Sequence, residues 1–210
     1  MFFISMLFKD MNLIEPIEKA LKKSNYITAT PIQAQSIPHV LNGDDLLGIA
    51  QTGTGKTAAF TLPILQLMFN SDKKARNTQT LILAPTRELA AQIGDSIREY
   101  GEYTEFKYTV IFGGVNQRPQ EKALERKPEI IIATPGRLLD LMNQGFVNLS
   151  QIEYFILDEA DRMLDMGFIN DINKILNKLP KKKQSLFFSA TMSDKITKLS
   201  RTILTNPKKV

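Results

Sequence analysis

Cysteine is absent from this chain of 210 residues. Disulfides and thiolate metal sites are therefore excluded. A chain without cysteine suits a reducing compartment, and we expect a cytoplasmic protein. Histidine is nearly absent too, because His39 is the single one. Its place between a proline and a valine indicates a structural role.

A long apolar run is also lacking. The most apolar segment is the start of the chain, "MFFISMLFKD", which meets charge at Lys9 and Asp10. A membrane-spanning helix needs about 20 apolar residues, and a signal peptide needs an early positive charge and a small-residue cleavage site. Neither pattern is present, so we expect no membrane association and a first segment that packs on the domain. Translation could begin at Met1 or at Met6.

Neither sign of charge dominates the composition. Lys and Arg number 27 against 22 Asp and Glu, which gives a net charge of +5 and a pI near 9.3. This mild basicity permits an anionic partner such as nucleic acid without requiring one. The chain is 43% hydrophobic and 23% charged, and both fractions are ordinary for one globular domain of this length.

Apolar, β-rich runs recur along the chain and alternate with stretches of helical spacing such as 88–100 and 168–179. Most of the runs are continuously apolar, which is typical of strands buried on both faces in a parallel sheet. They cover 45–50, 80–85, 108–114, 129–135, 154–160 and 185–191. The pattern predicts a doubly wound α/β domain with a mainly parallel central sheet flanked by helices, and ligands beyond the carboxyl ends of the strands.

The strongest single motif is "AQTGTGKT", which follows the first of these runs and precedes a helix-like segment. Gly53 and Gly55 let the backbone curl so that successive N–H groups point at phosphate oxygens, and the following helix adds its positive end. Lys56 can reach the β and γ phosphates, and the Thr57 hydroxyl can ligate Mg²⁺. The motif predicts a nucleotide site at Ala50, Gln51, Thr52, Gly53, Thr54, Gly55, Lys56 and Thr57. The alternative is a Gly/Thr-rich turn with a chance lysine.

A second motif is acidic: "YFILDEADRMLDMGF" places four carboxylates directly after an apolar run. A phosphate-binding loop needs an acidic residue at the end of a neighbouring strand to hold Mg²⁺, and Asp158 is placed there. Glu159 could orient or deprotonate the attacking water. We therefore assign Lys56 and Glu159 to catalysis, and Thr57 and Asp158 to the metal. An acidic helix start is the alternative, and Asp165 is interpreted as surface charge.

Together with "TPIQ", "PTRELA", "GG", "TPGR" and "SAT", these two motifs resemble the DEAD-box family of ATP-dependent RNA helicases. Seven short motifs in the right order make the resemblance specific. It implies a three-layer RecA-like domain over 1–210 that binds ATP and Mg²⁺ and serves as the ATP-binding part of a helicase. Within that domain, residues 1–38 would form an N-terminal adenine-recognition region.

The same resemblance assigns an adenine site to the segment "NYITATPIQ" and to an aromatic residue upstream. Tyr26 would stack on the adenine, Gln33 would bond its edge, and Phe8 matches the upstream aromatic. A ring offers a stacking face, and an amide offers both a donor and an acceptor. Core packing is the alternative for Phe8 and Tyr26.

Three further motifs would hold the sugar–phosphate backbone of one RNA strand. Their hydroxyls, guanidinium groups and backbone N–H groups suit phosphates without reading bases. The residues concerned are Pro85, Thr86, Arg87, Gly113, Gly114, Thr134, Pro135, Gly136 and Arg137. Ordinary turns and surface charge are the alternatives. In "SAT", Ser189 and Thr191 could bond Asp161 and couple ATP binding to strand separation.

The family has two RecA-like domains, and we find no second set of strands and no later arginine-rich motif in this sequence. We expect the second domain to be absent from this chain and to be its partner in the whole protein, which we expect to be monomeric. The chain alone should then bind adenine nucleotides, hydrolyse ATP very slowly and not unwind RNA, because the arginine that stabilises the transferring phosphoryl group would be missing. A nucleotide-gated RNA clamp and another P-loop nucleic-acid translocase are the alternatives.

Overall fold

A single parallel sheet forms the centre of the molecule. The computed structural model describes residues 6–71 and 77–210. Within them the strands lie in the order β3-β4-β2-β5-β6-β1-β7, and every neighbouring pair is parallel. The strands are β1 (Leu46–Ile49), β2 (Thr80–Leu83), β3 (Tyr108–Ile111), β4 (Ile130–Ala133), β5 (Tyr154–Leu157), β6 (Gln184–Ser189) and β7 (Lys208–Lys209). The predicted parallel α/β sheet is confirmed.

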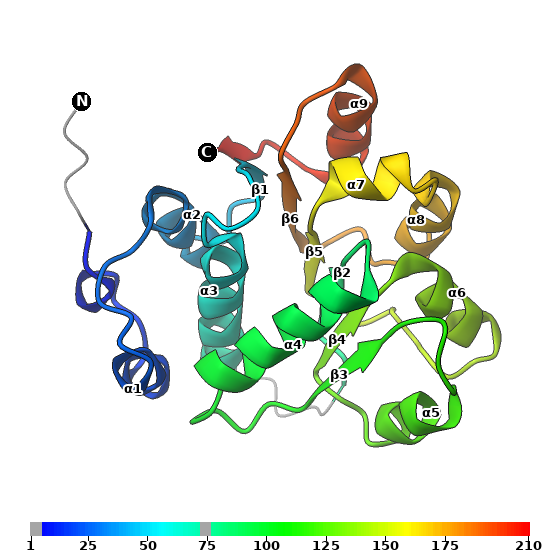
Figure 1. Cartoon of the computed structure of the whole chain (residues 1–210), viewed down its shortest axis with the longest axis horizontal. Coiled ribbons are helices and arrows are strands. Elements are labelled where there is room, and N and C mark those ends of the chain that lie inside the picture. The colour runs from blue at the N-terminus through cyan, green and yellow to red at the C-terminus, as the bar shows by residue number, and fades with distance from the viewer. Residues whose placement is uncertain (1–5, 72–76) are drawn as a thin grey trace.

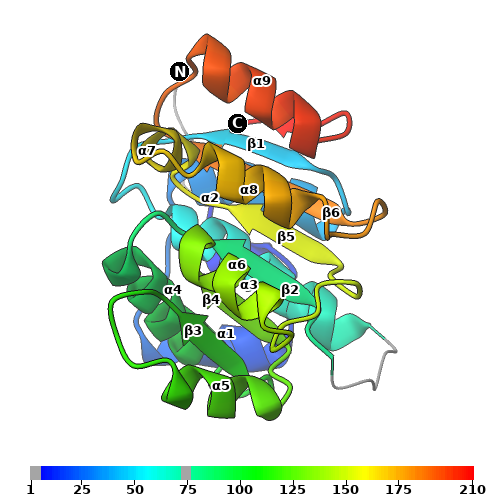
Figure 2. The same ribbon diagram turned by 90° about the vertical axis from the view of Figure 1, so that its right-hand side faces the viewer.

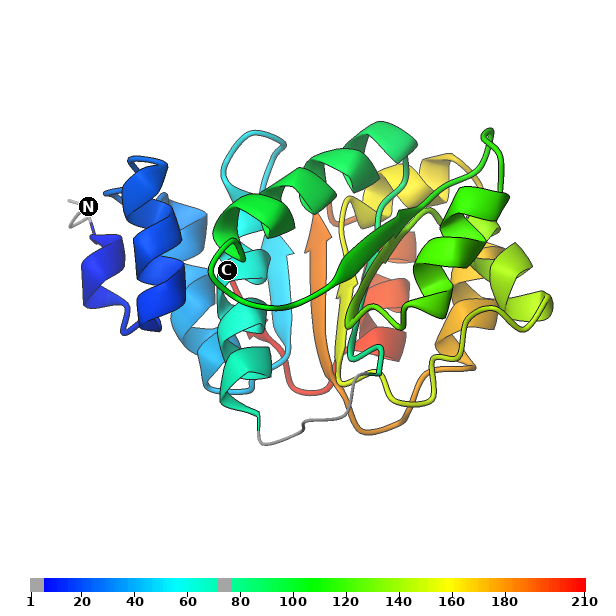
Figure 3. The ribbon, with the colours of Figure 1, turned by 90° about the horizontal axis from the view of Figure 1, so that it is seen from below.

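Helices cover both faces of this sheet and complete three layers, as Figures 1 and 3 show. One face carries α1 (Glu15–Lys23), α2 (Pro31–Leu41), α3 (Lys56–Asn70) and α4 (Arg87–Tyr100). The other carries α5 (Arg118–Glu125), α6 (Pro135–Asn143), α7 (Ala160–Asp165), α8 (Ile169–Leu176) and α9 (Asp194–Ile203). A short 3-10 helix, η1 (Phe8–Asp10), precedes α1. Among the described helices, none is both long and apolar enough to cross a membrane.

Adjacent strand residues supply two separate hydrophobic cores. Ile82 packs with the α1–α4 layer, whereas Leu81 and Leu83 pack with the α5–α9 layer. Phe188 and Phe187 divide in the same way. Because side chains alternate between the faces of a strand, a strand covered on both faces must be apolar throughout. This requirement explains the continuous apolar runs of the sequence.

All strands run in one direction, so the loops after them gather at one edge of the sheet. Backbone hydrogen bonds just beyond the strands show which loops are neighbours. The donors are the N–H groups of Ala50, Asp158, Ala84 and Thr134, and the acceptors are, in the same order, the carbonyl groups of Ser189, Leu83, Ala133 and Ile111. The loops after β1, β6 and β5 therefore occupy one half of this edge. The loops after β2, β4 and β3 occupy the other half, and Figure 2 shows the strands in this succession.

The N-terminal segment pairs with the chain just before α2. Ala29 N–H donates to Met6 carbonyl at 2.9 Å, and Phe8 N–H donates to Ile27 carbonyl at 3.1 Å. Phe8 is only 3% exposed and belongs to the core. The segment from Met6 onward thus packs on the domain as predicted, while the predicted placement of residues 1–5 lies outside the described residues.

Two elements differ from the sequence prediction. β7 was not predicted, because two lysines carry no apolar signal. Its backbone alone joins the sheet, through Lys208 N–H to the Asp45 carbonyl at 2.8 Å. The helical stretch predicted over 168–179 is shorter in the structure, where α8 ends at Leu176. Turns lead from there to Pro180, and the residue before a proline is disfavoured in helical conformation.

Gly48 in β1 yields a test of the packing between the sheet and α3. A Cβ atom at this position would lie 2.5 Å from two ring carbons of Phe188. Overpacking of this kind costs about 1–3 kcal/mol, so we expect Gly48→Ala to lower the urea midpoint of unfolding. Gly136→Ala is the control, because its Cβ would meet only Asp171, at 4.0 Å. Equal midpoints for the two variants would contradict the expectation.

Candidate functional site

The loop between β1 and α3 curls around two left-handed glycines. Gly53 has φ +84° and Gly55 has φ +94°, and Gly55 is the N-cap of α3. The Thr54 hydroxyl donates to the Gln51 carbonyl at 2.7 Å and closes the turn. This backbone conformation is available to glycine without strain. The loop therefore curls over the N-terminus of a 15-residue helix, an arrangement that favours anions.

Lys56 and Asp158 face one another at the base of this loop. Their side chains are 5% and 2% exposed, and the Lys56 Nζ lies 4.0 Å from an Asp158 carboxylate oxygen. The Nζ has no hydrogen-bond partner within the described chain. A buried ammonium without a hydrogen bond is costly, so the cation is available to an anionic ligand.

The carboxyl group of Asp158 is held away from water. Burial raises its pKa from the ordinary 3.8 to about 6, although the nearby Lys56 ammonium opposes the shift. The neighbouring Glu159 carboxylate adds to the increase. A divalent cation beside Asp158 would reverse this penalty, because it stabilises the ionised form.

The donor set fits Mg²⁺ held jointly with a nucleotide. Thr57 follows Lys56 in the first turn of α3 and is half-buried. Among the described residues, no group of three or more Asp, Glu, His or Cys side chains could hold a metal by itself. Mg²⁺ in nucleotide sites needs one or two protein ligands and takes its other ligands from phosphates and water. One carboxylate and one hydroxyl meet that requirement.

Glu159 has a strained backbone and a tethered side chain. Its φ of +49° is left-handed, which is uncommon for a residue other than glycine. One carboxylate oxygen accepts from the Thr52 hydroxyl at 2.9 Å, and the other accepts from Arg162 at 3.3 Å. The Glu159 carboxylate is thereby drawn to the phosphate-binding loop, because Thr52 belongs to that loop.

Gln33 is tied to the phosphate-binding loop. Its amide donates to the Gly55 carbonyl at 3.1 Å and accepts from the Thr30 N–H at 2.9 Å. A Cβ at residue 55 would clash with the Gln33 amide nitrogen. The amide predicted to contact adenine thus also fixes the loop to α2, and only glycine at position 55 leaves room for it.

The aromatic residues predicted for adenine form a row of edge contacts. Tyr26 meets Phe8 at 6.3 Å between ring centroids and Tyr100 at 5.8 Å. Tyr26 is 39% exposed, whereas Phe8 is buried. Both line a pocket of about 260 Å³ beside α1. Tyr26 is therefore the more accessible of the two rings, and the contact of either ring with adenine stays a prediction.

The residues predicted to couple the motifs contact one another in part. The Thr191 hydroxyl donates to an Asp161 carboxylate oxygen at 3.2 Å, as predicted. The Ser189 hydroxyl donates instead to the Thr191 carbonyl at 2.8 Å. The hydrogen bond expected from Ser189 to Asp161 is therefore replaced by one that shapes the turn presenting Thr191.

The motifs predicted to hold RNA follow β2, β4 and β3, the half of the edge away from the phosphate-binding loop. Thr86 caps α4 by accepting from Leu89 N–H at 3.3 Å, and Pro85 precedes it. Arg87 is exposed and pairs with Glu88 at 2.6 Å. Its guanidinium remains accessible to solvent.

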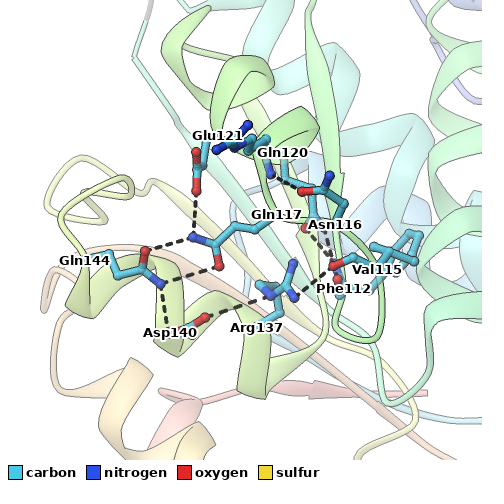
Figure 4. Close-up of polar contacts among 10 residues, drawn as sticks. Phe112, Val115, Asn116, Gln117, Gln120, Glu121, Arg137, Asp140 and Gln144 are labelled. Atoms are coloured by element: carbon cyan, nitrogen blue, oxygen red, sulfur yellow. Dashed lines mark hydrogen bonds and ion pairs between the residues drawn. The ribbon is translucent and has the colours of Figure 1, made fainter.

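Arg137 connects two of these motifs. It lies in the first turn of α6, after Thr134, Pro135 and Gly136, and donates to the Val115 carbonyl at 3.3 Å (Figure 4). The side chain is 13% exposed and one of its terminal nitrogens is buried without a partner in the described chain. Gly113 and Gly114 stand just before Val115 in the same exposed loop.

Several contributing residues are not evident from the motifs. Arg162 lies three residues after Glu159 on α7, and this spacing could have indicated the pair. Gln120 bonds the backbone of Phe112, eight residues before it. The sequence does not indicate that contact, because glutamine is common in polar helices such as this one and usually faces solvent there.

Known proteins are similar to this chain in sequence and in fold. A family model of DEAD/DEAH box helicases matches residues 30–199. The chain is 47% identical over 204 residues to the ATP-dependent rRNA helicase RRP3 of Ajellomyces capsulatus, across 97% of this chain and 41% of that protein. It is 44% identical over 204 residues to the ATP-dependent RNA helicase DeaD of Escherichia coli, across 97% and 32%. The crystal structure of a DEAD box protein from Methanococcus jannaschii matches with a TM-score of 0.90 at 40% identity, across 97% and 55%. The chain thus spans less than half the length of these two curated relatives.

The buried carboxyl group yields a pH prediction for the ligand-free chain. Because its pKa is raised to about 6, the neutral form of Asp158 stabilises the fold below its unfolded pKa, and this contribution is lost as the pH rises through about 6. Asp158→Asn cannot ionise. The unfolding free energy of Asp158→Asn minus that of the wild type should therefore increase by at most about 3 kcal/mol between about pH 4 and pH 7.

Urea unfolding across this pH range, without Mg²⁺ or nucleotide, measures that difference. Asp165→Asn is the matched control, because Asp165 is an exposed aspartate at the end of α7, the helix that follows Asp158. Its difference from the wild type should stay flat. A flat difference for Asp158→Asn as well would show that burial does not shift the carboxyl group.

Proposed function

Because this chain belongs to the DEAD/DEAH box helicase family, we propose that it is the ATP- and RNA-binding RecA-like domain of a DEAD-box RNA helicase. In the whole protein, ATP hydrolysis would drive the separation of RNA strands. The observation that carries the proposal is the buried Lys56 ammonium, which has no hydrogen-bond partner among the described residues and lies 4.0 Å from Asp158 at the base of a glycine loop. An ammonium and a carboxylate so placed suit a phosphate and its metal ion.

In the proposed nucleotide site, the N–H groups from Gly53 to Thr57 hold the phosphates. Lys56 neutralises charge on the β and γ phosphates, while Thr57 and Asp158 would hold Mg²⁺. When bound, the metal supplies positive charge between the phosphate oxygens. The adenine would stack on the exposed Tyr26 face and bond Gln33, whose contact with Gly55 links base recognition to the loop.

Glu159 is proposed to orient the attacking water or to accept its proton. The side chain is 7% exposed, and its carboxylate is already held by Thr52 and Arg162. Each carboxylate oxygen has two lone pairs, so one remains on each for water. Two tethers reduce the number of rotamers open to Glu159, which favours a fixed direction of attack.

RNA is proposed to lie along the half of the edge formed after β2, β4 and β3. The groups there are hydroxyls, guanidinium groups and free backbone, and these bind phosphates and sugars without distinguishing bases. The two halves meet where Asp158 N–H bonds to Leu83. The bond between Thr191 and Asp161 lies on the nucleotide side and would pass a change at the nucleotide to the neighbouring loops.

The rest of the protein is proposed to supply a second RecA-like domain. Without its arginine the transferring phosphoryl group lacks one source of positive charge, so this chain alone should turn ATP over very slowly and not unwind RNA. We further propose that the protein acts as a monomer in the cytoplasm, which a cysteine-free composition permits.

A nucleotide-gated RNA clamp is the second candidate. It is favoured by one observation, that both oxygens of Glu159 already accept hydrogen bonds from protein groups. A clamp needs nucleotide binding but no activated water. The two candidates therefore differ in what Glu159 does.

Replacing Lys56 and Glu159 separately tests the proposal. Lys56→Ala should weaken binding of a fluorescent ATP analogue with Mg²⁺ by at least about tenfold, because a charge-assisted contact is worth more than about 1.5 kcal/mol. Glu159→Gln should keep binding, since its amide oxygen still accepts from Thr52. In the full-length helicase it should lower RNA-stimulated turnover by about 10²–10⁴-fold.

Lys174→Ala is the control, because Lys174 is an exposed lysine on α8. Fluorescence anisotropy gives the affinities, and phosphate release gives the turnover. Unchanged nucleotide affinity in Lys56→Ala would refute the nucleotide site. Retained nucleotide binding with no RNA-stimulated turnover in the unaltered full-length protein would favour the clamp, and unchanged turnover in Glu159→Gln would refute the role of Glu159.

A further inference from the structure

Gln120 clamps the backbone just beyond β3. Its side-chain oxygen accepts from Phe112 N–H at 3.1 Å, and its side-chain nitrogen donates to the Phe112 carbonyl, also at 3.1 Å. Gln120 is 8% exposed and lies in the first turn of α5. A single amide thus satisfies both polar groups of one backbone residue.

The position of β3 explains why such a clamp is useful. β3 is an edge strand, and the Ile111 carbonyl accepts from Thr134 on the β4 side. Successive residues of a strand direct their backbone N–H and carbonyl groups to opposite sides. Phe112 therefore directs both groups away from β4, to the outer side of β3. No described strand pairs with it there, and the Gln120 amide takes the place of one.

The loop that follows is anchored at both ends and open between. A Cβ atom added at Gly113 or at Gly114 would meet no other atom within 4 Å, and Gly114 has φ +78°. Neither glycine N–H donates to another group of the described chain. Phe112 is fixed by Gln120 on one side, and the Val115 carbonyl is fixed by Arg137 on the other.

A side-chain network joins this loop to the next motif. Gln117 and Gln144 exchange hydrogen bonds at 2.8 and 3.4 Å, so α5 is tied to α6. Gln144 also donates to Asp140 at 3.0 Å, and Asp140 lies 4.0 Å from Arg137 (Figure 4). The glycine loop and the N-terminus of α6 are therefore held as one unit.

We propose that Gln120 is a positioning residue for RNA binding. Its amide holds the two glycines so that their free N–H groups and the residues at the start of α6 meet one RNA strand together. This inference rests on the proposed RNA-binding function. It adds a residue outside the motifs, one that acts only through the backbone of Phe112.

Two variants separate the chemistry of the clamp from its packing. Gln120→Ala removes both hydrogen bonds. Gln120→Glu keeps the size and the acceptor but sets a carboxylate against the Phe112 carbonyl. Because the two hydrogen bonds position the loop, we expect both variants to bind RNA about tenfold or more weakly. The affinity for a non-hydrolysable ATP analogue should stay unchanged.

The probes are a fluorescein-labelled oligouridylate for affinity and amide NMR spectra for the loop. In the unaltered chain, the Gly113 and Gly114 amide signals should move when the oligouridylate is added. In the variants these two signals should be shifted before any RNA is present. The control is Gln151→Ala. Gln151 is an exposed glutamine just before β5, at the amino ends of the strands and away from the loop after β3.

The outcomes distinguish this inference from the proposed function. Unchanged RNA affinity in Gln120→Ala and Gln120→Glu overturns the role of Gln120 alone. Equal losses of RNA and nucleotide affinity also overturn it, because a general structural role would then explain both. No binding of oligouridylate by the unaltered chain overturns the RNA-binding function and this inference together.

Discussion

The contact between Lys56 and Asp158 is the interaction on which the rest of the structure depends. Two opposite charges that are 5% and 2% exposed, yet 4.0 Å apart, gain little from each other relative to the water they have lost. The parallel register of β1, β6 and β5 places them together, because Lys56 lies beyond the end of β1 and Asp158 directly follows β5. The domain therefore maintains a charged site that a phosphate and a cation would satisfy better than the protein does.

The strand order divides the working edge of the sheet into two halves. Loops after β1, β6 and β5 carry the groups assigned to the nucleotide, and loops after β2, β4 and β3 carry the groups assigned to RNA. The halves meet between β5 and β2, where Asp158 and Leu83 share a backbone hydrogen bond. A movement of the loop at Asp158 would therefore act directly on β2, the strand that leads to Thr86 and Arg87.

Much of the fold follows from the sequence, because buried parallel strands must be apolar at every position. The same rule does not predict β7, because Lys208 joins the sheet through its backbone alone. In the site, the order of the motifs gives the loops, but not the direction of each side chain. Ser189 bonds its own turn instead of Asp161, and Gln33 reaches Gly55. Such contacts depend on rotamers and on neighbours distant in sequence, which spacing does not encode.

The edges of the sheet bear on how the protein behaves at high concentration. Open strand edges are templates for pairing with other molecules and for aggregation. At one edge β7 presents Lys208 and Lys209, both exposed, whose charges repel a second edge of the same kind. Beyond β3, at the other edge, the Gln120 amide occupies the hydrogen-bonding groups of Phe112. A residue that shapes a binding loop would in this way also shield the sheet from unwanted strand addition.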